Sequence, residues 1–425
     1  MRILTTLPLA VIILLLSSCS PPVVQTTPST PSVDVEPGTR TPQVIQPSPT
    51  PQNNLILWLT PTFAPDPSTL VGSLLEERLI GFQQAHPGIS ITVRLKEEQG
   101  PGGLLEALLA AHNVAPSVLP DVIAMDPIAL RSAALKELLI PLDGLVAQPN
   151  APEWYDHAIS TTYDLGSFFG LPFASDAEVL VYKTDRYPEA PSSWADLLTS
   201  SATFIFPAGD PNAAFTLFQY TALDGLLYDE SGMPTLDPVV LNDLFTFYHS
   251  AHVSGVLPTS IFQYHSPADT WDSLKSDQVS SAVAPLSSFL ADGNPETYAA
   301  VPLPSRTQPG ISPAENWSWA IVTPDAVRQS LAVELITWLT EPEFLGPWTY
   351  ALGMLPPTTS SLALWPEGSE AALVSSLVTV AQSKPTAEQL ATFGPTLHTA
   401  IEAFILGGVT PIEAARNALA ELQSP

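Results

Sequence analysis

The 425-residue sequence contains a single cysteine, Cys19, so neither an internal disulfide nor a sulfur-ligated metal site can form. Positive charge is also scarce, because 14 Lys and Arg stand against 42 Asp and Glu and the formal net charge is −28. Nucleic-acid binding depends on basic patches that neutralise phosphates, so we expect no nucleic-acid partner, and strongly anionic ligands are disfavoured. A neutral or cationic solute remains.

Motifs of common enzymes are absent as well. The sequence has no H-E-x-x-H, G-x-S-x-G or P-loop pattern. His249 and His252 stand three apart, but without acidic or cysteine partners nearby they are better explained as a solvated helix face than as a metal site. Paired carboxylates would also suit a glycoside hydrolase, whose geometry a sequence cannot measure. We therefore expect a protein that is not an enzyme, with no cofactor and no metal.

No apolar run is long enough to cross a membrane, which requires about 20 residues. Arg2 is followed by a ten-residue apolar run at residues 7–16 and then by two serines, the parts of a secretory signal. Leu16-Ser17-Ser18-Cys19 resembles the lipobox of bacterial lipoproteins, in which cleavage precedes the cysteine and lipid is attached to it. The resemblance predicts a signal peptide at 1–18 and lipidation of Cys19; the alternative is a plain secretory signal with an incidental cysteine.

A change of composition follows the signal. Residues 19–53 are rich in proline, threonine, serine, glutamine and valine and contain hardly any large apolar side chains. Such a segment cannot bury enough surface to offset the entropy of ordering it, so we predict a disordered linker between the lipid anchor and the folded body. The remaining chain of about 370 residues exceeds what one hydrophobic core usually holds, which predicts two domains.

Strand-like and helix-like patterns alternate through this remaining chain. Residues 55–59 form a short apolar run typical of a buried strand, and residues 89–95 alternate apolar with polar side chains. Between them, apolar residues at helical spacing predict a helix over residues 70–85. The other predicted elements are a helix at 103–112, strands at 121–126, 179–182, 204–206 and 317–322, and helix starts at Pro191, Thr323-Pro324 and Thr410-Pro411. This alternation predicts an α/β fold with right-handed crossovers.

The order of several short stretches resembles the extracellular solute-binding proteins of bacterial ABC importers, in the branch that includes maltodextrin- and other sugar-binding members. The stretches are FQQAHPGI at 82–89, PDVI at 120–123, GLPF at 170–173, LVYKTD at 180–185, residues 191–198, WSWAI at 317–321 and ITWLT at 336–340. Each is a weak pattern alone, but their shared order covers nearly the whole chain after the linker.

The resemblance implies a two-lobed periplasmic-binding-protein-like α/β fold (type II), with each lobe a sheet flanked by helices. Lobe I would hold residues 54–173 plus 305–354, and lobe II residues 174–304 plus 355–425. Three hinge crossings would lie at 171–173, 302–304 and 353–356, where prolines restrict the backbone. Closure about such a hinge covers a ligand and reports its presence to a partner.

Carboxylates mark the expected site. Ligands of open α/β sheets bind beyond the carboxyl ends of strands, which singles out Asp66 after the first strand and Asp126 at the end of the third. The resemblance adds Asp176 and Asp210, and with less support Glu178. Asp66, Asp126 and Asp210 all precede a proline, so each has the alternative of capping a turn or a helix.

Four aromatic residues complete the predicted site. Phe63 follows the first strand, and Trp317 and Trp319 lie two apart, so they share one face if their strand is regular. Phe289 stands where sugar-binding relatives often carry a stacking tryptophan. Carboxylates accept hydrogen bonds from hydroxyls and aromatic faces cover sugar rings, so the set predicts a carbohydrate ligand. For Trp317 and Trp319 the alternative is packing between sheet and helix, and for Phe63 it is an anchor at the surface of a lobe.

Taken together, the resemblance implies a lipid-anchored receptor on the outer face of the cytoplasmic membrane. It would capture a carbohydrate by hinge closure and deliver it to the membrane subunits of an ABC importer, and a monomer suffices for this task. Two alternatives stay open: the same fold binding a cationic ligand or a peptide, or a sensor without a dedicated permease.

Overall fold

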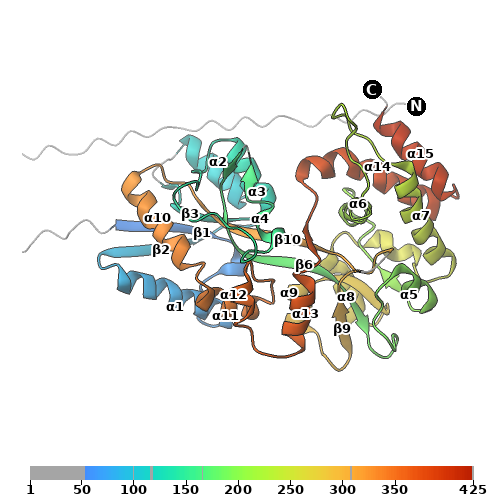
Figure 1. Cartoon of the computed structure of the whole chain (residues 1–425), viewed down its shortest axis with the longest axis horizontal. Helices are drawn as coiled ribbons and strands as arrows, with labels where there is room; N and C mark the ends of the chain where they lie inside the picture. The colour runs from blue at the N-terminus through green and yellow to red at the C-terminus, as the bar shows by residue number, and fades with distance from the viewer. Residues whose placement is uncertain (1–52, 99, 115–117, 165, 307–308, 424–425) are drawn as a thin grey trace, which may run out of the picture. The chain divides into compact units, whose positions relative to one another are not determined.

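A computed structural model describes residues 53–98, 100–114, 118–164, 166–306 and 309–423 (Figure 1). The predicted signal peptide, the lipidation site Cys19 and the linker up to residue 52 lie outside the described residues. Residues Thr50–Pro425 form one compact unit. Within the described part, no helix combines the length and the apolar character that crossing a bilayer requires.

A nine-stranded sheet runs through this unit in the order β2-β1-β3-β10-β6-β8-β7, with β11 beside β10 and β9 beside β6. Its strands are β1 (Asn53–Leu59), β2 (Ile89–Leu95), β3 (Val122–Met125), β6 (Leu171–Lys183), β7 (Phe204–Ile205), β8 (Ser281–Pro285), β9 (Tyr298–Val301), β10 (Ser312–Ile321) and β11 (Ala381–Ser383). The strands β4 (Tyr163–Asp164) and β5 (Ser167–Phe168) pair separately as an antiparallel hairpin.

The first strands pair in parallel, as the alternation of elements predicts. β1 pairs with β2 and with β3, and α1 (Leu70–Ala85) and α2 (Leu104–Val114) provide the crossovers. Thr69 caps α1 by accepting a hydrogen bond from the amide of Gly72, and Leu75, Leu79 and Phe82 form its buried face. The predicted helix at 70–85 and the strands on either side of it are therefore confirmed.

The remaining helices cover the two halves of the sheet, with α1, α2, α3, α10 and α11 around one half and α5 to α8, α14 and α15 around the other (Figure 1). They are α3 (Pro127–Leu135), α4 (Asp156–Ile159), α5 (Trp194–Thr199), α6 (Ala214–Thr221), α7 (Pro238–Val253), α8 (Pro267–Lys275), α9 (Leu286–Asp292), α10 (Ala326–Trp338), α11 (Pro342–Leu352), α12 (Thr359–Leu362), α13 (Ser369–Leu377), α14 (Ala387–Ile405) and α15 (Pro411–Leu422). The predicted start of α15 is confirmed, with Thr410 and Glu413 in a reciprocal capping box. By contrast, α10 is capped by Asp325 instead of the predicted Thr323.

Buried apolar residues form two separate cores. The first core draws on residues 55–174 and 317–354, and the second on residues 177–314 and 355–418. Two long strands pass between the cores. The first half of β6 pairs with β10, whereas its second half pairs with β8 and β9. Hydrogen bonding therefore joins the two halves into one sheet while their cores stay separate, which gives a two-lobed α/β fold.

The chain passes between the cores at three places. Backbone hydrogen bonds of 2.8 and 3.0 Å between Ser175 and Leu355 bring the first and third crossings side by side. The second lies inside β10, between Ala314 of the second core and Trp317 of the first, and not at 302–304 as the family resemblance implies. A strand that continues through both cores carries no turn signal to mark the change. The residue bounds of the two lobes stay a proposal.

Candidate functional site

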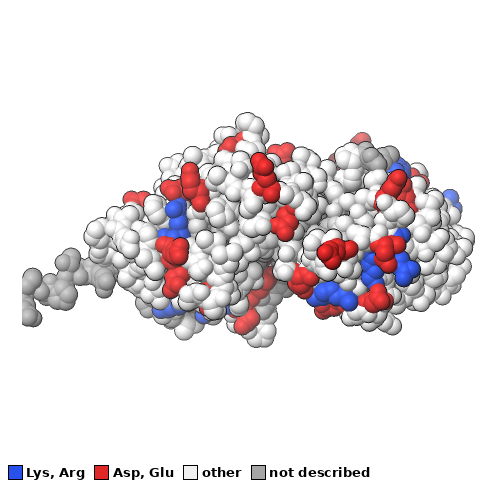
Figure 2. Space-filling model, turned by 90° about the horizontal axis from the view of Figure 1, so that it is seen from below, with Lys and Arg blue, Asp and Glu red and all other residues white. Residues whose placement is uncertain are grey.

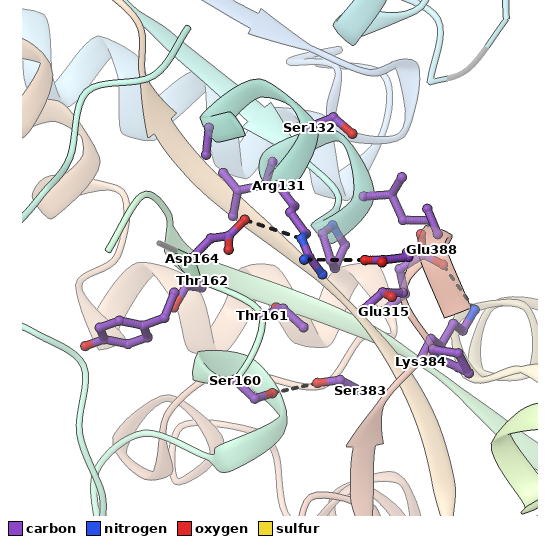
Figure 3. Close-up of a pocket in the computed structure, with 18 of the residues that line it drawn as sticks. Arg131, Ser132, Ser160, Thr161, Thr162, Asp164, Glu315, Ser383, Lys384 and Glu388 are labelled. Atoms are coloured by element: carbon purple, nitrogen blue, oxygen red, sulfur yellow. Dashed lines mark hydrogen bonds and ion pairs between the residues drawn. The ribbon is translucent and has the colours of Figure 1, made fainter. Parts of the chain in front are cut away.

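Segments that pack on the two cores form opposite walls of a pocket of ≈ 570 Å³ (Figure 3). From the first core come α3, which buries Leu130, and the segment 160–164; from the second come the start of α6 and the β11–α14 connection, where Leu390 packs. The charged side chains of the lining are Arg131, Asp164, Glu315, Lys384 and Glu388. This is the volume of a small-molecule site, which typically spans about 300–1,000 Å³.

Asp126 fixes one wall by starting α3. Its carboxylate accepts hydrogen bonds from the amides of Ile128 at 2.8 Å and Ala129 at 2.9 Å, and Pro127 occupies the first helical turn. Such a cap satisfies amides that have no partner within the helix. Burial raises the pKa of Asp126 above its ordinary value, and the negative charge of Glu315 adds to this effect against the two hydrogen bonds.

Arg131 projects from α3 between carboxylates of both walls, as Figure 3 shows. Its Nε lies 3.3 Å from Asp164 Oδ2 in β4, and its terminal nitrogen lies 3.8 Å from Glu388 Oε2 in the first turn of α14. The guanidinium is 44% exposed, compared with 21% for Asp164 and 70% for Glu388. One side of Arg131 is thus held within its own lobe, and the other reaches toward the opposite lobe.

Lys384 forms a tighter group at the inner edge of the pocket. Its Nζ lies 3.0 Å from Glu178 Oε1 in β6 and 3.1 Å from Glu315 Oε2 in β10. Burial alone lowers the pKa of Lys384, but the two carboxylates outweigh burial and raise this pKa above its ordinary value. Lys384 is therefore charged, and its ion pairs join β6 and β10 to the start of α14.

Asp176 lies next to this group at the first crossing. It accepts hydrogen bonds from the amide of Ser287 at 3.1 Å and from the Ser287 hydroxyl at 2.5 Å. Burial raises the pKa of Asp176 to about 6, although the Ser287 hydrogen bonds and the charge of Lys384 oppose the shift. Near neutral pH its carboxylate thus adds to the negative charge around Glu315.

The predicted aromatic residues lie in the cores. Phe63, Trp317 and Trp319 are 0%, 5% and 0% exposed, and they pack in the first core with Phe173 and Trp348. Ring centroids lie 5.0 Å apart for Phe63 and Trp317, and 4.3 Å apart for the stacked Phe173 and Trp319. None of these rings lines the pocket. Trp317 and Trp319 thus take the packing alternative, whereas Phe63 is fully buried and is not an anchor at the surface of a lobe.

The two tryptophans face the core of their own lobe. The pairing register of β10 with β6 shifts between Trp317 and Ser318 because β6 has an extra residue there, Phe173, whose ring packs on Trp319. Phe289 is also buried, in the second core, with its ring edge-on to Trp271 at 6.3 Å. It too lines no part of the pocket.

The other predicted carboxylates occupy turns. Asp66 is exposed and accepts a hydrogen bond from the Ser68 amide at 2.9 Å, and this bond lowers its pKa. Asp210 accepts hydrogen bonds from the amides of Asn212 and Ala214 at 2.9 and 3.0 Å, which orders the start of α6 beside the pocket. The capping alternative accounts for the contacts of Asp66, Asp126 and Asp210. Ligand contact by these residues and by Asp176 stays a prediction.

The charged residues that line the pocket were not among the predicted site residues. They come from segments far apart in the sequence, and no motif connects Arg131 with Glu388. The only local signal was a capping pattern at Thr386 and Gln389, which marks the start of α14 and hence the wall that carries Glu388. Across the described residues, no group of three or more His, Cys, Asp or Glu side chains is placed to hold a metal ion.

Comparison with known proteins gives a consistent result. Residues 61–344 match the family of bacterial extracellular solute-binding proteins. Similar solved structures include the GacH receptor of Streptomyces glaucescens GLA.O, crystallised unliganded and with acarbose (19% identity, TM-score 0.64, 87% of this chain and 97% of that one). The sugar-binding protein MalE of Xanthomonas citri is also similar (17%, 0.69, 87% and 96%).

UgpB of Mycobacterium tuberculosis, solved in complex with glycerophosphocholine, has the same fold (18% identity, TM-score 0.65, 87% of this chain and 98% of that one). At these identities the likeness shows the fold, which is the two-lobed periplasmic-binding-protein-like one. No protein of curated function matches the sequence.

Proposed function

This chain belongs to the family of bacterial extracellular solute-binding proteins, and we propose that it is the sugar-binding subunit of an ABC importer. It captures a sugar or an oligosaccharide between its lobes, closes about the crossings, and delivers the solute to the membrane subunits. The observation that carries this proposal is the ≈ 570 Å³ pocket with walls from both cores. Closure moves these walls together and so couples the ligand to the shape that a permease recognises.

The lining suits a polyhydroxylated neutral solute. Arg131 and Lys384 offer N–H donors, and Asp164, Glu315 and Glu388 offer acceptors for hydroxyl protons. Apolar residues, among them Leu130, Leu135, Phe169 and Leu390, cover the faces of the pocket between these groups. Similar solved structures bind maltose or acarbose, which supports a carbohydrate as the ligand class.

The family is extracellular, and the lipobox-like stretch before Cys19 supports attachment of this protein to the outer face of the cytoplasmic membrane by lipid. The charge of the protein surface bears on how the protein is held at the membrane. On the face in Figure 2, acidic side chains are spread over both halves, and several of the fewer Lys and Arg side chains lie beside acidic ones. Such a surface is repelled by anionic headgroups, so the lipid on Cys19 supplies the attraction to the membrane.

A cationic ligand is the second candidate, and one observation favours it. Lys384, which lines the pocket, is paired with both Glu178 and Glu315. Burial and the charge of Glu315 raise the pKa of the nearby Asp126 and Asp176, so carboxylates outnumber cations beside the pocket. A protonated amine would offset this excess of negative charge.

A thermal-shift screen of the full chain tests both candidates. The screen uses maltose, maltotetraose and tagatose, with glycerophosphocholine and spermidine as non-sugar arms. A ligand that binds only the native state stabilises it by about 2.7 kcal/mol at 100 times its Kd, so a sugar that binds must raise Tm. A response to spermidine alone that disappears in moderate salt would replace the sugar by a cation, because ion pairing is screened and sugar hydrogen bonding is not. No response to any sugar would contradict the proposal.

A further inference from the structure

We infer that Arg131 of α3 and Glu388 of α14 form a donor–acceptor clamp that grips a hydroxyl group of the solute from opposite walls of the pocket. The clamp rests on the proposed function and deepens it, because it names the pair that selects a neutral hydroxylated ligand. It also assigns a binding role to two residues from different lobes.

The distance between the two groups is the first observation. The Arg131 nitrogen and Glu388 Oε2 are 3.8 Å apart, close enough for charge attraction but too far for a hydrogen bond. Donors of the guanidinium and lone pairs of the carboxylate therefore remain available. A hydroxyl bonded to both would hold these atoms about 4.5–5 Å apart, so the pair has to open by roughly 1 Å. The exposure of both side chains permits that movement.

An ion pair with Asp164 orients the side chain of Arg131 for this role. Asp164 in β4 lies 3.3 Å from its Nε and is only 21% exposed. A guanidinium has five N–H donors in a rigid plane, so fixing one edge on Asp164 orients the other edge. Figure 3 shows that this other edge points toward Glu388.

Glu388 does not take part in capping α14. The capping box of α14 is closed by Thr386 and Gln389, with Thr386 donating its amide to Gln389 Oε1 at 2.8 Å. Glu388 thus stands in the first turn of the helix, where negative charge is favoured, without capping it. Its carboxylate faces the pocket at 70% exposure.

The charges of the pair select the ligand. An anion would gain from Arg131 but meet Asp164 and Glu388, and a cation would gain from Glu388 but meet Arg131. A hydroxyl accepts from the guanidinium and donates to the carboxylate, so it satisfies both groups at once. Lys384 offers a contrast in the same pocket, because its two carboxylates already bind it at 3.0 and 3.1 Å.

The test is isothermal titration of the full chain and its variants with maltotetraose, maltose and tagatose. We expect Arg131→Gln to weaken binding of the sugar that the unmodified protein binds most tightly by about 10- to 100-fold, because a charge-assisted hydrogen bond is lost. We expect Glu388→Gln to weaken binding by about 3- to 10-fold, since the amide still accepts. Tm of unliganded Glu388→Gln should stay within about a degree, because the ion pair that it loses is exposed. Arg131→Gln also loses the ion pair with the partly buried Asp164, so its Tm should fall, and its binding is measured at a temperature at which the variant is folded.

Two matched controls have the same charge changes outside the pocket. Glu402→Gln lies in the same helix as Glu388 and is 47% exposed, and Arg306→Gln is 51% exposed and pairs with Asp243 at 2.6 Å. Both controls should bind sugar like the unmodified protein. If the unmodified protein binds a sugar and both pocket variants bind it as tightly or more tightly, the clamp is wrong while the sugar function stands. If the unmodified protein binds none of the sugars, the proposed function fails and the clamp fails with it.

Discussion

The aromatic cluster of the first core and the charged pocket meet on a single strand, β10, and they hold opposite kinds of side chain. Trp317 and Trp319 are packed against other rings, whereas Glu315, two residues before Trp317, lines the pocket. The difference shows that large aromatic residues on a central strand pack against the sheet and its helices, and this packing leaves no ring face open to a ligand. The polar groups of the site lie where the strand passes from one core to the other.

Replacing Trp319 by alanine probes the aromatic side of this comparison and has the largest expected effect. The side chain is fully buried, stacks on Phe173 and lies parallel to Trp348 with centroids 6.3 Å apart. Its removal should lower the free energy of unfolding by about 3–5 kcal/mol, as large-to-small changes of aromatic core residues do. Urea unfolding followed by circular dichroism measures the loss.

Sugar affinity of the folded Trp319→Ala protein should stay within about twofold of the unmodified protein, since only stability is affected. Trp319→Phe serves as the milder control and should lose less stability. A large loss of affinity with little loss of stability would instead place Trp319 in the ligand site.

Asp176→Asn probes the charged side. Because burial raises the pKa of Asp176 from 3.8 to about 6, the native state holds the proton more tightly than the unfolded chain. Asp176 therefore contributes stability that is fully present below about pH 4 and is lost as the pH rises through 6. The neutral variant should be more stable than the unmodified protein at pH 7.5 by about 1–3 kcal/mol.

Urea unfolding of both proteins at pH 4, 6 and 7.5 checks this expectation. The gap between the variant and the unmodified protein should become small toward pH 4, where the carboxyl of Asp176 is protonated in the native state and only about half ionised in the unfolded chain. A gap that is the same at all three values would show that the ionisation of Asp176 is not its cause.

Asp126 lies between the two regions, and its substitutions have the smallest expected effect. Asp126→Ala removes the cap of α3 and should cost about 1 kcal/mol of stability, whereas Asp126→Asn keeps an acceptor at the cap and should cost almost nothing. Chemical unfolding measures both. Sugar affinity decides between the roles of Asp126: if the alanine variant binds far more weakly while its stability is unchanged, Asp126 is a ligand contact and not only a cap.

The order of strands and helices could be predicted because it depends on local patterns. The alternation at residues 89–95 and the Thr410-Pro411 start of α15 are such patterns, and both correspond to elements of the structure. The start of α10 shows the limit of a local rule. Thr323-Pro324 resembles a capped start, yet Asp325 accepts hydrogen bonds from the amides of Val327 and Arg328 and begins the helix two residues later.

The candidate site was harder to predict because its residues meet only after folding. Arg131 and Glu388 come from helices in different lobes, so no spacing in the sequence connects them. The shift in register after Trp317 is equally invisible, since a strand with a bulge has the same composition as a regular one. An aspartate before a proline is a local pattern, and Asp66, Asp126 and Asp210 all have it. Their hydrogen bonds to nearby amides are local as well, so the pattern predicts caps and turns better than it predicts a ligand site.

The position of β10 affects the timing of folding. This strand lies between β3 and β6 in the sheet, yet it is formed by residues 312–321, long after its neighbours in the chain. The centre of the sheet cannot close until most of the polypeptide is available, and pairing over such separations is slow. Until residues 312–321 are available, β3 and β6 lack the strand that joins them, so the sheet that connects the two lobes cannot be completed.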